Sequence, residues 1–331
     1  MATVANDRPR VYIARRIPAE ALDMLAAEFA CSVWDSDEQP VPRNVLQGEL
    51  ADAEGALIML TDRIDRALLE GAPRLKMIAN MAVGHDNIDL EACAERGVMV
   101  SNTPDVLTQT TADLVWALLM ATARRLVEGQ KVVESDAWRS WSPMMLAGQD
   151  VHGATLGIIG AGRIGQAVAR RARGFDMTVL YHGRSRKPEF ERSEGARFVS
   201  LEELLETADF VVPMVALTPE TRHLIGEPEL RCMKPSAILI NASRGPVVDE
   251  AALQRALEAE RIWSAGLDVW DREPVRADHP LLSFPKVVGL PHIASASIAT
   301  RTRMATLAAE NLVAGLSGRV PPTLLTPVPG R

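Results

Sequence analysis

A glycine-rich turn near the middle of the chain constrains the fold more than any other feature of the sequence. The run Gly160-Ala-Gly162-Arg-Ile-Gly165 follows the apolar stretch 155–159 and precedes a helix-like run over 166–173. In such a strand–turn–helix unit, the first glycine allows a tight turn, the second lets the backbone approach a pyrophosphate, and the third lets helix and strand pack closely. The helix N-terminus also offers N–H donors to phosphate groups. The pattern therefore predicts a dinucleotide-binding unit.

From residue 154 onward, strand-like and helix-like segments alternate as they do in a doubly wound sheet. Strands are predicted at 155–159, 178–181, 210–212, 237–240, 264–269 and 287–290. Strands that alternate with helices indicate a parallel sheet covered by helices on both faces. We therefore predict a six-stranded Rossmann-type sheet for this part of the chain.

The N-terminal third shows the same alternation and predicts a second α/β unit that ends near Pro104. Its predicted strands are 10–14, 56–60, 75–79 and 98–101, and its predicted helices are 19–29, 64–70 and 88–96. The apolar stretch 108–126 predicts a helix buried between two layers, which we place at the junction of two domains. A terminal helix over 297–316 could return to the first unit.

Length and composition are those of a two-domain globular protein. The chain has 331 residues, whereas one domain has roughly 100–200. Hydrophobic residues make up 47% and charged residues 24%, so a substantial core can form without metals or disulfides. The three cysteines, Cys31, Cys93 and Cys232, have no metal-binding or CxxC spacing, so we expect incidental thiols in a reducing compartment.

Charge and hydropathy exclude several classes of partner. A net charge of -7 does not favour binding to a nucleic-acid backbone. The N-terminal segment contains charges and no apolar run, so we expect neither a signal peptide nor a membrane anchor there. No run of 18 apolar residues occurs elsewhere. We therefore expect a cytoplasmic protein without a membrane partner, and an extended Pro-rich tail from Pro321.

A basic loop follows the second strand of the dinucleotide-binding unit. An NAD-selective site usually carries an acidic residue at the end of this strand, which binds the ribose 2′-hydroxyl. No acid occurs over 178–187, and Arg184 and Arg186 lie where a 2′-phosphate would be. Guanidinium groups make charge-assisted hydrogen bonds to phosphate, so we predict NADP(H) in preference to NAD(H). A solvated basic loop is the alternative, and contact of His182 with the phosphate is left open.

Three residues with acid–base or charged side chains, Arg244, Glu273 and His292, each follow one of the last three predicted strands. Ligands bind at this edge of an open α/β sheet, so the three can converge beside a nicotinamide. Reduction of a 2-keto acid needs a hydride donor, a proton for the carbonyl oxygen and a cation for the carboxylate. His292 is the predicted acid, because histidine can hold a proton near neutral pH. Glu273 would orient the ring and favour its protonated form, and Arg244 would bind the carboxylate and polarise the keto oxygen.

Each of these residues also has an ordinary structural interpretation. Arg244 alone could form a surface ion pair, and His292 alone could be a core histidine with its hydrogen bonds satisfied. Their position after successive strands of a dinucleotide fold favours catalysis. The other histidines, His85, His152, His182, His223 and His279, show no spacing typical of metal ligands, so we predict no metal site.

An irregular segment over 136–153 carries two tryptophans, Trp138 and Trp141. Large aromatic side chains in such segments often pack against a partner chain. The sequence leaves two interpretations open: packing on a partner subunit, or packing on their own domain.

Taken together, these segments resemble the D-isomer-specific 2-hydroxyacid dehydrogenase family over roughly residues 10–326. The resemblance is carried by 83–89 (VGHDNID), the Gly160–Gly165 loop, 241–245 (NASRG), 265–269 (AGLDV), Glu273-Pro274 and Pro291-His292. Within the family, the chain is most similar to glyoxylate/hydroxypyruvate reductases, through 138–141 (WRSW), the basic loop 182–187 and 311–316 (NLVAGL).

The resemblance implies an architecture and a reaction. Residues 1–105 plus 293–331 would form a flavodoxin-like substrate-binding domain, and 106–292 an inserted NADP-binding Rossmann domain. Both would be open parallel sheets with helices on both faces, and the active site would lie in a cleft that closes by hinge motion. The expected enzyme is a homodimer that reduces glyoxylate and hydroxypyruvate with NADPH.

The expected site residues fall into two groups. The cofactor-binding residues are Gly160, Gly162, Arg163, Ile164, Gly165, Gly183, Arg184, Ser185, Arg186, Ala242, Ser243 and Asp268, the last near the nicotinamide carboxamide. The substrate-binding residues are Leu60, Val83 and Gly84, which would line the pocket or offer N–H groups to the carboxylate, together with Arg244, His292, Ser295 and, from the partner subunit, Trp141.

Two departures from the family pattern bear on substrate choice. Ala294 stands where glycine is common, and His85 replaces the more usual aromatic residue. An enzyme of the same fold that acts on 2-ketogluconate, phenylpyruvate or a phosphorylated hydroxy acid is the first alternative. A dinucleotide-sensing corepressor is another, since such a protein can keep the Arg, Glu and His residues. A lyase or methyltransferase on the same fold is disfavoured by that trio.

Overall fold

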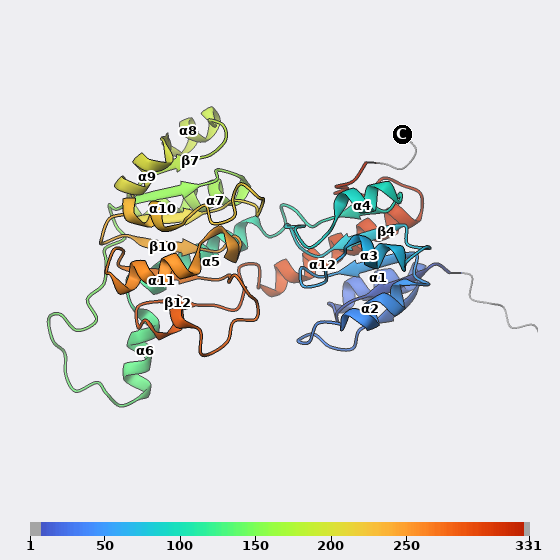
Figure 1. The fold of residues 1–331 in the computed structure, drawn as a ribbon, viewed down its shortest axis with the longest axis horizontal. Helices are drawn as coiled ribbons and strands as arrows, with labels where there is room; N and C mark the ends of the chain where they lie inside the picture. The colour runs from blue at the N-terminus through green and yellow to red at the C-terminus, as the bar shows by residue number, and fades with distance from the viewer. Residues whose placement is uncertain (1–7, 328–331) are drawn as a thin grey trace, which may run out of the picture. The chain divides into compact units, whose positions relative to one another are not determined.

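The computed structural model describes residues 8–327 and contains two compact units (Figure 1). Among the described residues, unit 1 consists of 8–107 and 296–327, and unit 2 of Thr108–Ser295. The chain thus passes between units at 107/108 and 295/296, slightly after the sequence-based boundaries at 105/106 and 292/293.

Unit 1 is built on a five-stranded parallel sheet with strand order β2-β1-β3-β4-β5. This is the flavodoxin-like order, as the resemblance implied. The strands are β1 (Arg10–Ile13), β2 (Ala30–Val33), β3 (Gly55–Ile58), β4 (Met77–Asn80) and β5 (Met99–Ser101). The helices are α1 (Ala19–Glu28), α2 (Arg43–Leu50), α3 (Arg66–Glu70), α4 (Leu90–Glu95) and α12 (Ile298–Leu316).

Helices cover both faces of this sheet. Side chains of α2, α3 and α4 share one core cluster with Tyr12 and Ile58 of the strands. Helices α1 and α12 pack against each other, and α12 also packs on β3 and β4. The terminal helix does therefore return to the N-terminal unit, and burial on two faces explains the nearly continuous apolar strands.

Two elements of unit 1 were not predicted from the sequence. Strand β2 follows directly on α1 without a turn signal, and its residues are all half-buried, so no apolar alternation marks it. Helix α2 is short, contains Gly48 and has only Leu46 and Leu50 buried. Both elements depend on packing against neighbours rather than on a strong local pattern.

Unit 2 contains a seven-stranded parallel sheet with strand order β12-β11-β10-β9-β6-β7-β8. The first six strands in chain order give the Rossmann arrangement, and β12 extends the sheet. The strands are β6 (Thr155–Ile159), β7 (Thr178–His182), β8 (Arg197–Phe198), β9 (Phe210–Pro213), β10 (Ile238–Asn241), β11 (Ser264–Leu267) and β12 (Val288–Gly289). The helices are α5 (Thr108–Ala123), α6 (Leu126–Glu134), α7 (Arg163–Ala172), α8 (Pro188–Glu194), α9 (Leu201–Thr207), α10 (Glu227–Cys232) and α11 (Glu250–Glu258).

The prediction of six strands was wrong because it missed β8. This strand has only two residues, Arg197 and Phe198, which is too short for a periodic pattern. The helix predicted over 108–126 was also too long. It ends at Ala123, because Arg125 adopts a left-handed backbone with φ of 53°, after which α6 begins in a new direction.

Two core clusters lie on the two faces of the seven-stranded sheet. One contains buried residues of α5, α7 and α8, and the other contains those of α9, α10 and α11. Helix α5 packs on α7, β10 and β11, which explains why it is apolar over much of its surface.

Helix α6 and the segment after it extend away from the sheet of unit 2 (Figure 1). No regular element occurs over 136–153, as predicted. The side chain of Trp138 is 57% exposed and that of Trp141 is 75% exposed. Packing of these two tryptophans on their own domain, one of the two interpretations of the sequence, is therefore not observed.

The chain ends are described only in part. Leu324 forms an antiparallel bridge with Ser101, so the described part of the Pro-rich tail packs beside β5. The described residues do not include 328–331, which belong to the predicted extended tail. They also do not include 1–7, part of the N-terminal segment for which we predicted neither a signal peptide nor a membrane anchor. Within 8–327, no helix combines the length and apolar character needed to cross a membrane.

Candidate active site and nucleotide site

The carboxyl ends of β10, β11 and β12 carry the three predicted catalytic residues. Strand β11 pairs in parallel with both β10 and β12, so these three ends lie at one edge of the sheet. His292 Nδ1 lies 2.8 Å from Glu273 Oε2, and the side chains are 22% and 29% exposed. The pair uses one ring nitrogen of His292 and leaves Nε2 as the second proton-carrying position.

The electrostatic surroundings keep Glu273 ionised. Burial by itself would raise the pKa of this carboxyl group, but the hydrogen bond and charge of His292, the backbone N–H of Trp270 and the charge of Arg244 outweigh burial and lower it. Trp270 N–H donates to Oε1 at 3.1 Å, so both carboxylate oxygens are engaged.

Asp268 fixes the backbone at and after His292. The carbonyl oxygen of Asp268 accepts the N–H of His292 at 2.8 Å, and its carboxylate accepts those of Ile293 at 2.8 Å and Ala294 at 2.9 Å. The side chain is completely buried, and burial raises the pKa of Asp268. The sequence placed Asp268 near the nicotinamide but gave no sign of this bracing role, which depends on three backbone donors.

A tight turn after β10 positions Arg244. The buried Asn241 donates from Nδ2 to the carbonyl of Arg244 at 2.9 Å, and its Oδ1 accepts the N–H and hydroxyl of Ser243. Arg244 Nη1 in turn donates to the carbonyl of Ser243 at 2.9 Å. The predicted cofactor residues Ala242 and Ser243 lie inside this turn. Asn241 itself was missed, although an amide directly after a strand is a recognisable turn signal.

The glycine loop has the geometry that its sequence predicted. Gly160 has a φ of +100°, and a β-carbon there would lie 2.6 Å from the carbonyl oxygen of Met214. A β-carbon on Gly165 would lie 2.3 Å from the carbonyl oxygen of Gly160. Gly162 caps α7, and a β-carbon there would meet no heavy atom within 4 Å. The open space at Gly162, beside the first N–H groups of Arg163 and Ile164, is a cradle that fits a pyrophosphate.

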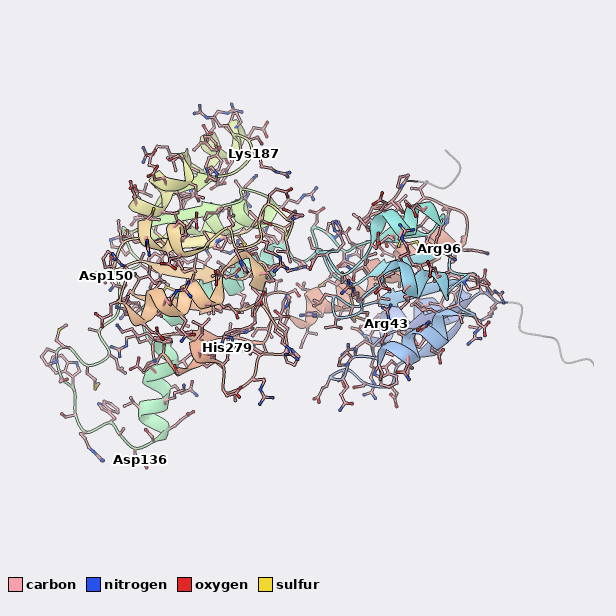
Figure 2. All side chains as sticks on the ribbon, in the orientation of Figure 1. Arg43, Arg96, Asp136, Asp150, Lys187 and His279 are labelled. Carbon is pink, nitrogen blue, oxygen red and sulfur yellow. The ribbon has the colours of Figure 1, made fainter. Side chains whose placement is uncertain are left out.

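The basic loop after β7 is exposed and partly organised by an acid that sequence reasoning missed. The loop residues Arg184, Ser185 and Arg186 are exposed. Lys187, labelled in Figure 2, is the last residue of this loop. Arg186 Nε lies 2.8 Å and 3.0 Å from the two carboxylate oxygens of Glu191. Glu191 lies one helical turn into α8, beyond the window in which an acid at the strand end would be expected. Gly183 is half-buried at the start of the loop.

The predicted substrate residues of unit 1 follow β3 and β4. Asn102 Nδ2 donates to the carbonyl of Val83, and Asn80 Nδ2 to that of Gly84, both at 2.8 Å. In a trans peptide the N–H points opposite to the carbonyl, so holding the Val83 carbonyl also fixes the N–H of Gly84. Leu60 is half-buried after β3.

The remaining predicted positions are less constrained. Ser295, the last residue of unit 2, is half-buried. The two residues that depart from the family pattern differ in setting: Ala294 is 6% exposed and braced by Asp268, whereas His85 Nδ1 is buried with no hydrogen-bond partner among residues 8–327. Over the same residues, no group of three or more His, Cys, Asp or Glu side chains could hold a metal ion.

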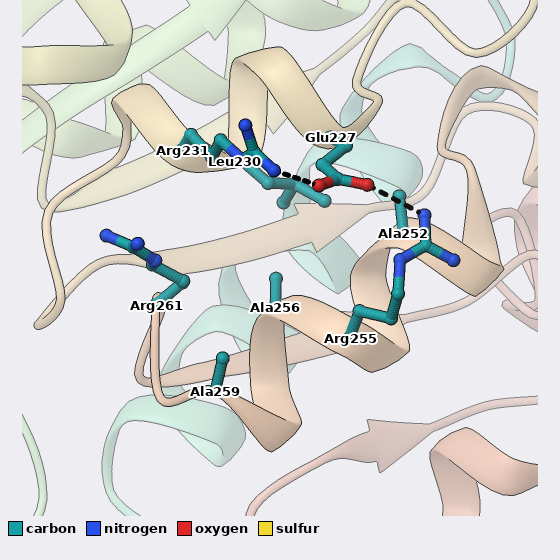
Figure 3. Close-up of a pocket in the computed structure, with 8 residues that line it drawn as sticks. All are labelled: Glu227, Leu230, Arg231, Ala252, Arg255, Ala256, Ala259 and Arg261. Atoms are coloured by element: carbon teal, nitrogen blue, oxygen red, sulfur yellow. Dashed lines mark hydrogen bonds and ion pairs between the residues drawn. The ribbon is translucent and has the colours of Figure 1, made fainter.

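A cavity of about 220 Å³ between α10 and α11 contains none of the predicted site residues (Figure 3). Its lining has one acidic side chain, Glu227, which pairs with both Arg231 and Arg255, and the further arginine Arg261 leaves the cavity with an excess of positive charge. The sheet edge that carries His292 is a better candidate for catalysis, since its groups are coupled and chemically competent.

Comparisons with known proteins agree with this geometry. Residues 116–294 match the family model described as D-isomer specific 2-hydroxyacid dehydrogenase, NAD binding domain. The glyoxylate reductase of Thermococcus onnurineus is 50% identical over 322 residues, which cover 96% of both chains. A crystal structure from Thermus thermophilus superposes with a TM-score of 0.90 at 46% identity and covers 96% of this chain and 100% of that one.

A second solved structure is informative because of its ligands. The NADPH-dependent glyoxylate/hydroxypyruvate reductase from Sinorhizobium meliloti, in complex with NADP and malonate, has a TM-score of 0.84 and 34% identity, and covers 96% of this chain and 97% of that one. The chain belongs to the D-isomer-specific 2-hydroxyacid dehydrogenase family. It is an oxidoreductase with an NAD(P)-binding Rossmann domain, as predicted from the sequence.

Proposed function

We propose that this enzyme reduces glyoxylate and hydroxypyruvate to the 2-hydroxy acids with NADPH, and that His292 donates the proton. The observation that carries the proposal is the 2.8 Å contact between His292 and Glu273 at the edge of the Rossmann sheet. Relatives named as glyoxylate reductases, about half identical over nearly the whole chain, support the substrate class.

The chain's own groups would perform the acid–base part of the reaction. The nicotinamide cofactor, when bound, supplies a hydride to the keto carbon. His292 gives the proton on Nε2 to the carbonyl oxygen, while Glu273 stabilises the protonated ring through Nδ1. Arg244 binds the substrate carboxylate and stabilises negative charge that develops on the oxygen. The N–H groups of Val83 and Gly84 would bind the carboxylate from unit 1.

The cofactor preference is a separate part of the proposal. The cradle at Gly162 would accept the pyrophosphate of either dinucleotide, so discrimination depends on the loop after β7. Arg184, Ser185 and Arg186 are exposed there and would bind a 2′-phosphate. Glu191 holds Arg186 in a defined place, and a phosphate would share or displace this ion pair.

We further propose a homodimer in which Trp141 contributes to the partner's active site. The exposed large apolar side chains of α6 and its following segment support this, since monomers rarely expose such a group together. They are Leu126, Val127, Val133, Trp138, Trp141, Met144 and Met145. The three free cysteines fit a reducing compartment, and we place the enzyme in the cytoplasm.

The test is cofactor oxidation, followed by absorbance, with each keto acid and each cofactor. We expect fast loss of NADPH with glyoxylate and hydroxypyruvate and slower loss of NADH. Faster loss of NADH would overturn the assignment of the basic loop but keep the reaction. Turnover confined to bulkier substrates such as 2-ketogluconate would overturn the substrate assignment. No turnover with any keto acid would contradict the proposed reaction.

A further inference from the structure

Trp270 contacts all three segments that carry Arg244, Glu273 and His292. It lies between β11 and Glu273 and is 3% exposed. Its backbone N–H donates to Glu273 Oε1 at 3.1 Å, and its indole Nε1 donates to the carbonyl of Leu290 at 2.9 Å. Leu290 lies two residues before His292, so Trp270 is hydrogen-bonded to Glu273 and to the strand segment that leads into His292.

Two glycines show how closely Trp270 is packed against these segments. A β-carbon on Gly289 would lie 2.7 Å from Trp270 Cζ2, so the indole ring rests on the backbone of β12. A β-carbon on Gly245 would lie 1.9 Å from the carbonyl carbon and oxygen of Trp270. Gly245 directly follows Arg244, so the third segment also abuts Trp270. Only residues without a side chain allow both approaches.

The segment after Trp270 is supported by the hydrogen-bonded side chains of Glu250 and His279. Glu250 Oε1 accepts the N–H of Asp271 at 2.8 Å, and Glu250 Oε2 lies 3.2 Å from His279 Nε2. The ring of His279, labelled in Figure 2, packs edge-on against Trp270 with centroids 5.2 Å apart. A cavity of about 320 Å³ borders Glu250, Asp271 and His279. Solid packing is therefore lacking on that side, and the Glu250–His279 pair holds the segment instead.

From these contacts we infer that Trp270 is a positioning residue for the acid–base pair, with Glu250 and His279 as its support. The inference rests on the roles proposed above for Glu273 and His292. Trp270 fixes the distance between Glu273 and the backbone that leads into His292. Asp268 fixes the backbone just after His292, through the N–H groups of Ile293 and Ala294. Proton delivery depends on this distance, since a displacement of about 1 Å can cost roughly 100-fold in rate.

Trp270→Phe is the direct test, because it keeps an aromatic ring but removes the donor to Leu290. We expect kcat to fall by about tenfold or more, with little change in the Kd for NADPH. We also expect the acidic limb of the kcat/KM profile to move to higher pH, since a loosened Trp270 N–H lowers the pKa of Glu273 less strongly. The groups that face Glu273 are His292, Arg244 and, through its charge, Asp268. Trp263→Phe, in the same unit beside Lys286, is the matched control and should leave all three quantities unchanged.

Glu250→Ala is the second variant, in case the first does not fold. It removes the acceptor for Asp271 and the partner of His279 without changing Trp270, and a smaller fall in kcat with the same pH shift is expected. Glu258→Ala, on the exposed side of the same helix, is its control.

Unchanged kcat and pH profiles in both variants would overturn the inference. A parallel loss of NADPH binding and Tm would also overturn it, because the role would then be only structural. His292→Ala, measured alongside, separates the two hypotheses: if it turns over like the wild type, the proposed role of His292 fails, whatever Trp270 does.

Discussion

The proposed catalytic edge and the proposed cofactor loop of unit 2 differ in how firmly their side chains are held. At the catalytic edge, both oxygens of Glu273 are engaged and the backbone of His292 is held by Asp268. In the loop after β7, Arg184 and Arg186 are exposed, and Arg186 is held by an ion pair with Glu191. The side chains to which we assign proton transfer are thus fixed by several bonds each, whereas those to which we assign phosphate recognition are exposed charges with at most one partner acid.

The two regions should accordingly differ in how they respond to substitution. Exposed ion pairs typically contribute about 0–1 kcal/mol, because water and salt screen them. Half-buried, hydrogen-bonded pairs contribute more and tolerate less displacement. Loss of one group should therefore disable the catalytic edge, while the loop should lose selectivity gradually.

The largest effect is expected for His292→Ala. Removing a general acid typically costs roughly 100- to 10,000-fold in kcat. NADPH binding, measured by fluorescence titration, should stay close to the wild-type value, because the glycine cradle is untouched. Equal losses of binding and turnover would show that His292 has a structural rather than a chemical role.

Arg244→Ala should have the next largest effect. A hydrogen bond to a charged group contributes about 1.5–3 kcal/mol, which corresponds to a roughly 10- to 100-fold fall in kcat/KM. Both a higher KM for the keto acid and a lower kcat are expected in steady-state kinetics. Arg244→Lys keeps the charge but not the fork geometry and should recover only part of the loss. A wild-type kcat/KM in the alanine variant would exclude Arg244 as the carboxylate ligand.

The double variant Arg184→Ala plus Arg186→Ala tests the other side of the comparison. We expect the Kd for NADPH to rise by about tenfold while that for NADH changes little, because only NADPH carries the 2′-phosphate. Arg192→Ala, an exposed arginine of α8, is the matched control. If both cofactors weaken equally in titrations, the loop does not read the 2′-phosphate.

The smallest effect concerns stability. Because the folded-state pKa of Glu273 is lowered, its ionised form stabilises the protein above the pKa of glutamate in the unfolded chain. That contribution disappears as the pH falls through the folded-state pKa. Glu273→Gln should therefore lower Tm by roughly a degree or two near neutral pH, and the difference should vanish in acid. Glu258→Gln is the exposed control, and a pH-independent difference for Glu273→Gln would contradict the assigned cause.

The elements with strong local signals were predictable from the sequence. The glycine loop, the trio after successive strands and both parallel sheets follow from spacing and apolar periodicity, which are local properties. Strand β8 and the break before α6 escaped prediction, because one has two residues and the other depends on a left-handed arginine. The amino-acid composition of a segment does not reveal such backbone conformations.

The supporting roles of Asp268 and Trp270 escaped prediction for a different reason. Asp268 and Trp270 act on backbone groups of other segments, and any residue can supply a backbone N–H or carbonyl. The residue that contributes the backbone group can therefore be of any type, and the sequence gives no signal for these contacts. Glu191 was missed because it lies in α8, beyond the end of β7 where an acidic residue would be expected, although it pairs with Arg186 of the loop.

The division of the chain has an evolutionary consequence. The glycine cradle, the basic loop and the acid–base trio all lie within the uninterrupted segment Thr108–Ser295, whereas Leu60, Val83 and Gly84 lie in unit 1. Recombination at the two ends of that segment would transfer all of the proposed cofactor-binding and acid–base residues of unit 2 together into another protein. Substrate choice would then change through the protein that replaces unit 1, while the residues of unit 2 stay the same.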